Sequence, residues 1–149
     1  MSDTQKLLEF IYKNAEMGRK TVDPIKNMNN GQRFQETLDR MLSDYNEICT
    51  EADRLLKESG VPEASGLNIG EKMMTEMSLR FSTMKDRSIS HLADMLLKGA
   101  SMGVTDISKK LEEYKDADEG SVRLAKRLLK MNSDTIDEMK SFLTVTADA

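Results

Sequence analysis

The sequence has few of the residues on which most enzymes and secreted folds depend. Its 149 residues include one cysteine, one histidine, two prolines and no tryptophan. The lone Cys49 cannot form a disulfide within the chain and suits a reducing compartment, so we expect a cytoplasmic protein. The single histidine, His91, removes most catalytic arrangements, and nothing in the sequence places a nucleophile beside it. We therefore expect a protein that is not an enzyme.

Long hydrophobic runs and excess positive charge are also missing. No apolar run approaches the roughly 20 residues that span a bilayer. The first residues lack the basic segment and apolar core of a secretory signal. The net charge of -4 leaves no basic stripe that could displace counterions from a phosphate backbone. We expect neither a membrane protein nor a nucleic-acid-binding protein.

Apolar residues that recur at steps of three and four are abundant, and this spacing is typical of amphipathic helices. The pattern predicts helices over residues 4–22, 32–59, 69–85, 89–115 and 118–143 of a single domain, residues 1–149. The first helix should be capped by Asp3 or Thr4 and should kink or end before Pro24. A break is expected at residues 86–88, before the fourth helix.

The second predicted helix has the most regular pattern, and its end is clearly marked. Its apolar positions follow a seven-residue repeat that suits near-antiparallel packing. These positions are Phe34, Leu38, Met41, Tyr45, Ile48, Ala52 and Leu55. Gly60 is expected in the left-handed conformation that ends a helix, followed by Val61 and Pro62.

Glycines and methionines in the middle of the chain suggest close packing. Gly99 and Gly103 fall on the apolar face of one helix, where glycine costs about 1 kcal/mol relative to alanine. We therefore expect a neighbouring backbone to pack closely on both. The twelve methionines concentrate in this region, and they either fill irregular core gaps or line a pliable pocket for an apolar ligand. The central methionines are Met73, Met74, Met77, Met84, Met95 and Met102.

Two helical hairpins joined by a short crossover helix predict an all-α, up-down four-helix bundle. This layout resembles the ferritin-like bundles. The stretch from Glu51 to Leu55, which ends in Gly60 and Pro62, is similar to their second helix and its exit. The apolar spacing from Arg127 to Leu143 is similar to that of their last helix.

The resemblance implies a di-iron site, but the required ligands are missing. That site takes a glutamate from each of two helices and a Glu-x-x-His pair from each of the other two. No Glu-x-x-His occurs in this sequence, and the matching places hold Ile48 with Glu51, and Asn132 with Thr135. The remaining candidate ligands are Glu16, Glu51 and Asp94, together with His91. We expect no cofactor, with iron or another divalent metal at a reduced site as the alternative.

Asn132 and Thr135 are polar residues on the predicted apolar face of the last helix. Buried polar groups cost free energy unless they are hydrogen-bonded. They are either poorly satisfied remnants of a lost metal site or members of a network with Glu51 or Asp94. The sequence therefore predicts a protein that acts through self-association or contact with a partner protein. A metal or redox protein and a carrier of a small apolar ligand are the alternatives.

Overall fold

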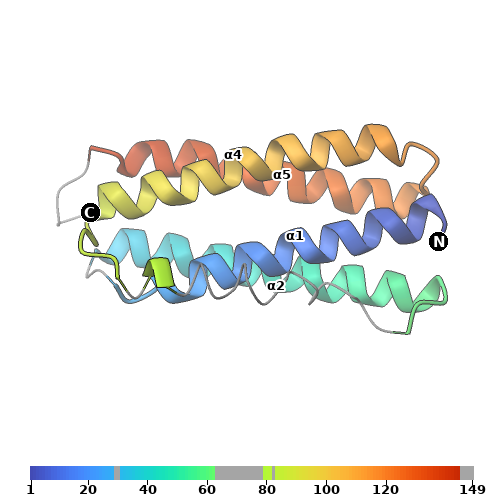
Figure 1. The fold of residues 1–149 in the computed structure, drawn as a ribbon, viewed down its shortest axis with the longest axis horizontal. Helices are drawn as coiled ribbons and strands as arrows, with labels where there is room; N and C mark the ends of the chain where they lie inside the picture. The colour runs from blue at the N-terminus through green and yellow to red at the C-terminus, as the bar shows by residue number, and fades with distance from the viewer. Residues whose placement is uncertain (29–30, 63–78, 82, 145–149) are drawn as a thin grey trace.

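The computed structural model describes residues 1–28, 31–62, 79–81 and 83–144. Four long α-helices dominate these residues: α1 (Asp3–Ile25), α2 (Gln32–Glu58), α4 (Ile89–Glu113) and α5 (Glu119–Phe142). They lie side by side along one long axis (Figure 1). The described ranges contain no strand, which confirms the all-α prediction. None of the helices described is long and apolar enough to cross a membrane.

The helices form two antiparallel hairpins, α1 with α2 and α4 with α5, and α2 runs in the same direction as α4 (Figure 1). At one end of the molecule, Gln5 donates a hydrogen bond to the Ser59 carbonyl at 2.8 Å, and the Asp118 amide donates to Thr4 at 2.8 Å. At the other end, the Ser90 hydroxyl donates to the carbonyl of Leu143. The Asp118–Thr4 bond therefore joins the two hairpins at one end, while the Gln5–Ser59 and Ser90–Leu143 bonds each join the two helices of one hairpin.

The predicted crossover helix, residues 69–85, lies mostly outside the described residues, as do Met73, Met74 and Met77. Residues 79–81 are helical, and residues 84–88 are not. Ser88 caps α4, because its side chain accepts a hydrogen bond from the His91 amide. The break predicted before the fourth helix is confirmed.

The core largely follows the predicted stripes but shifts near the end of α2. Leu56 is fully buried and Leu55 only half-buried, so the prediction of Leu55 as the core position is wrong. A straight helix drifts about 20° per heptad against a seven-residue repeat. After three heptads from Phe34, the buried face has therefore moved on by one residue.

The two ends of α1 also differ from the prediction. Ser2, rather than Asp3 or Thr4, is the N-cap, and it forms a reciprocal capping box with Gln5. Pro24 does not break the helix, which continues to Ile25. Ile25 is fully buried, and its packing holds the last turn in place. The chain turns only at Asn27, whose φ of 73° is left-handed, a conformation that asparagine tolerates better than most residues.

The end of α2 agrees with the prediction. Gly60 has a φ of 95°, and the Val61 amide donates to the Leu56 carbonyl at 2.9 Å. A left-handed glycine just after the helix, with the next amide bonded back to a carbonyl five residues earlier, is the arrangement of a Schellman motif.

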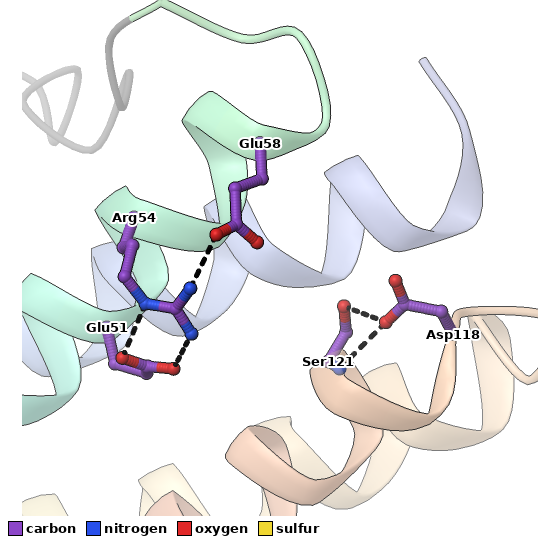
Figure 2. A network of polar contacts seen from close by, with 5 residues as sticks. All are labelled: Glu51, Arg54, Glu58, Asp118 and Ser121. Atoms are coloured by element: carbon purple, nitrogen blue, oxygen red, sulfur yellow. Dashed lines mark hydrogen bonds and ion pairs between the residues drawn. The ribbon is translucent and has the colours of Figure 1, made fainter.

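Asp118 caps the start of α5. Its carboxylate accepts from the Ser121 amide at 2.8 Å and from the Ser121 hydroxyl at 2.6 Å (Figure 2). These hydrogen bonds to Ser121 lower the pKa of the Asp118 carboxyl. The charged form of Asp118 therefore stabilises the α4–α5 hairpin.

Asp118→Ala should lower the free energy of unfolding by about 1 kcal/mol at neutral pH, because it removes the cap. Since the folded-state pKa is lowered, this contribution is present above the unfolded pKa of about 4 and is lost as pH falls through the folded pKa. Urea denaturation at several pH values measures it. Asp116→Ala, an exposed acid in the same turn, is the control. Equal losses in the two variants would contradict the cap.

Candidate functional site

A buried layer at the middle of the molecule takes one residue from each of the four long helices. These residues are Gly18 of α1, Tyr45 of α2, Gly103 of α4 and Asn132 of α5. A Cβ atom on Gly18 would lie 2.5 Å from the Tyr45 ring, and one on Gly103 would lie 2.9 Å from the Asn132 amide nitrogen. The two glycines therefore leave the space that the two large side chains fill.

A hydrogen bond joins the two halves of this layer. The Tyr45 hydroxyl donates to Asn132 Oδ1 at 3.3 Å, and the two side chains come from residues 87 positions apart. Burial, followed by the nearby Asp44 carboxylate, raises the pKa of Tyr45 to about 12. The phenol is therefore neutral at physiological pH and acts as a hydrogen-bond donor rather than a base.

Asn132 is only partly satisfied. The residue is 3% exposed, and no described residue accepts a hydrogen bond from its buried Nδ2 atom. Thr135, one turn later, is 6% exposed. Of the two alternatives for Asn132, the network with Glu51 or Asp94 is not found among the described residues, where Glu51 pairs with Arg54 and Asp94 pairs with Lys98. The partner is Tyr45 instead, which the sequence pattern indicated only as an apolar core residue.

A cavity of about 230 Å³ lies beside this layer, between α2 and α5. Tyr45 and Thr135 line it together with two methionines and four charged residues. The full lining comprises Arg40, Met41, Asp44, Tyr45, Met131, Asp134, Thr135 and Glu138. Arg40 forms an ion pair with Glu138, and Lys130 pairs with Asp134 at 2.8 Å. The cavity is therefore polar and is bordered by more acidic than basic groups.

A second buried polar group lies between α1 and α2. Glu16 is 3% exposed and pairs with Arg19 at 2.7 Å and with Lys20 at 3.3 Å. The Cys49 thiol lies 3.9 Å from Glu16, and burial, followed by that carboxylate, raises the pKa of Cys49 to about 11. The thiol is therefore protonated at neutral pH and weakly nucleophilic.

The candidate metal ligands are dispersed rather than gathered. Glu16 belongs to the cluster just described, and Glu51 is held by Arg54 on the outer side of α2 (Figure 2). Asp94 pairs with Lys98 on α4, and His91 lies in the first turn of that helix. Within the described ranges, no three His, Cys, Asp or Glu side chains are placed to hold a metal ion.

The two predicted glycine contacts have different outcomes. No atom of a described residue lies within 4 Å of a Cβ built on Gly99, so the close approach expected there is not found in the part of the chain that the structure describes. Gly99 does not lie on the buried face of α4, and the residue is exposed. Gly103 does have a close neighbour, but it is the Asn132 side chain rather than a backbone. Gly18 was not singled out from the sequence, although a glycine on the apolar stripe of the first helix is the same signal.

Comparison with protein-family models, with curated proteins and with solved structures gives no match to this chain.

Gly18→Ala and Gly99→Ala should change stability in opposite directions. The new Cβ at Gly18 overlaps a buried ring whose hydroxyl is hydrogen-bonded, so we expect a loss of about 1–3 kcal/mol. At Gly99 the methyl group meets no described residue, and the better helix propensity of alanine should add up to about 1 kcal/mol. Urea denaturation compares the two variants. Stabilisation by both would show that the Tyr45 ring does not pack on α1.

Tyr45→Phe and Asn132→Leu should be coupled. Either change alone leaves a buried polar group without its partner and should cost about 1–3 kcal/mol. The double variant removes both groups, and its loss should be smaller than the sum of the two single losses. A double-mutant cycle by urea denaturation measures this difference. Additive losses would contradict an energetically significant bond.

Proposed function

We propose that this chain is a non-enzymatic four-helix bundle of ferritin-like topology that acts through protein contact, as a homodimer in a reducing compartment such as the cytoplasm. The parallel course of α2 and α4 supports the topology, because it is the arrangement that a long crossover produces. The lone, buried Cys49 supports the compartment.

The observation that carries a non-catalytic role is the neutral layer at the centre. The places that match the family's metal ligands on the last helix hold Asn132 and Thr135, and Asn132 is bonded to a neutral tyrosine. The remaining carboxylates, Glu16, Glu51 and Asp94, are each paired with a basic side chain. A group already neutralised in this way is a poor ligand for a divalent cation.

The outer face of α4 is the best candidate for the contact between chains. The described ion pairs between helical segments join α2 to the end of α1 and to α5, through Lys26–Asp39, Arg127–Glu47 and Arg40–Glu138. Those described on α4 lie within the helix itself. Met102, in the middle of this face, is 68% exposed, an unusual exposure for a large apolar side chain at mid-helix.

The charges along this face of α4 are arranged so that two copies of the helix, packed antiparallel, place opposite charges against each other. Asp94 lies toward the start of α4 and Lys109 toward its end, with Met102 close to the midpoint. A second copy packed antiparallel, with its two-fold axis between residues 101 and 102, brings Asp94 of each chain, which also pairs with Lys98 of its own helix, opposite Lys109 of the other. This complementarity favours a second copy of the chain over an unrelated partner.

Met102→Glu should convert the dimer into a monomer, because two buried carboxylates would meet at the two-fold axis. Light scattering on the eluting peak should give twice the 16.8 kDa chain mass for the wild type and the chain mass for the variant. Ser133→Glu, an exposed position on α5, is the control and should remain dimeric.

A monomeric wild type would overturn the homodimer. Elemental analysis of the same sample, purified without chelator, tests the non-catalytic role separately. Two iron atoms per chain would contradict that role and would favour the metal-binding alternative.

A further inference from the structure

The sulfur-containing side chains of this chain differ sharply in how open they are to solvent. Met102 lies at the middle of α4 and is 68% exposed. Cys49 is buried between α1 and α2, and burial raises its pKa to about 11, so little of it is the thiolate that oxidants attack. Of the other methionines that the structure describes, Met1 alone is exposed. A dissolved oxidant therefore reaches Met102 far more readily than Cys49.

The surroundings of Met102 on α4 are uncharged and open. Residues 99–105 carry no charged side chain. Gly99, one turn before Met102, has no side chain that could shield the sulfur, and no atom of a described residue lies within 4 Å of a Cβ built there. The thioether is therefore accessible in the single chain and suits an apolar contact when a second chain covers it.

The hydroxyl groups beside Met102 already donate their hydrogens. Ser101 donates to the Leu97 carbonyl at 2.9 Å, and Thr105 donates to the Ser101 carbonyl at 3.2 Å. Each hydroxyl has a single hydrogen to donate. In an antiparallel dimer with its axis between residues 101 and 102, Met102 of each chain lies opposite Ser101 of the other. A new hydrogen-bond acceptor on Met102 would be buried there, and neither hydroxyl could bond to it without losing its present bond.

We propose that Met102 is a modification site, at which hydrogen peroxide oxidises the thioether to the sulfoxide and so prevents the chain from dimerising. The inference rests on the homodimer proposed above. The sulfur lone pair attacks one oxygen of the peroxide, an S–O bond forms, and the O–O bond breaks. The other oxygen leaves as water with both hydrogens. The sulfur loses two electrons, which reduce the peroxide.

The sulfoxide acts on the dimer through its oxygen. The modification turns an apolar side chain into a polar one with a strong acceptor, and a buried acceptor without a donor is costly. Peroxide reacts with the separate chain, in which Met102 is exposed. Dimerisation therefore protects the site, and oxidation holds the chain in its monomeric form.

Treatment with hydrogen peroxide, followed by peptide mass mapping and light scattering, tests this site. Mapping should find an added oxygen at Met102, and the mass in solution should fall from twice the 16.8 kDa chain mass toward the chain mass. The dissociation constant of the dimer should rise about tenfold or more.

Met102→Leu is the matched control, because leucine is apolar and of similar size but has no sulfur. This variant should be dimeric and should remain dimeric after the same treatment, although it keeps every other methionine of the chain. Dissociation of the treated variant would place the sensitive residue elsewhere and would overturn the proposal.

Two further measurements separate a switch from general damage. Methionine sulfoxide reductases for both epimers, supplied with a thiol reductant, should restore the dimer of the oxidised wild type. A higher chain concentration should slow the oxidation of Met102 but not that of Met1, which is 63% exposed. A dimer that is not restored, or equal slowing at both residues, would contradict the switch.

The failure of the switch and the failure of the dimer are distinguishable. An untreated dimer that survives complete oxidation of Met102 would overturn the switch and leave the dimer standing. An untreated wild-type chain that is already monomeric would overturn both.

Discussion

The contact of the Tyr45 ring with the backbone of Gly18 sets how closely α1 and α2 approach at the middle of the molecule. No side chain larger than hydrogen fits at residue 18 unless the ring moves. The ring is held by its hydroxyl, which donates to Asn132, and Asn132 in turn lies against Gly103 of α4. All four long helices therefore depend on one tyrosine, one asparagine and two glycines being present together.

This layer also accounts for a core that is not purely apolar. Placing a hydroxyl and an amide in the interior costs free energy that one hydrogen bond only partly offsets. A single buried polar pair can fix the register of packed helices, because sliding one helix by a turn would leave both groups unpaired. We hypothesise that the Tyr45–Asn132 bond has this role. The tyrosine and the turn that carries Asn132 and Thr135 also form one wall of the cavity between α2 and α5.

Errors in the sequence predictions fall where packing outweighs local preference. The sequence predicts a kink or an end of the first helix before Pro24, but α1 continues to the buried Ile25, one residue beyond it. Leu55 fits a seven-residue repeat, whereas the true helical period buries Leu56. Gly99 and Gly103 look equivalent in the sequence, yet among the described residues Gly103 has a close neighbour on another helix and Gly99 has none. At Pro24 and at the two glycines, packing against other parts of the chain decides, whereas at Leu55 the helical period decides.

The sequence by itself determined the four long helices, most of their apolar faces, the glycine stop at Gly60 and the burial of Asn132 and Thr135. These features follow from spacing and from short-range caps, which a chain carries locally. Only the tertiary structure decided that Tyr45 is the partner of Asn132, that Gly18 makes room for its ring, and that a cavity lies beside Thr135. Such choices depend on how far each helix is rotated against its neighbours. That rotation is set by the fit of side chains from distant parts of the chain, which spacing along one helix does not encode.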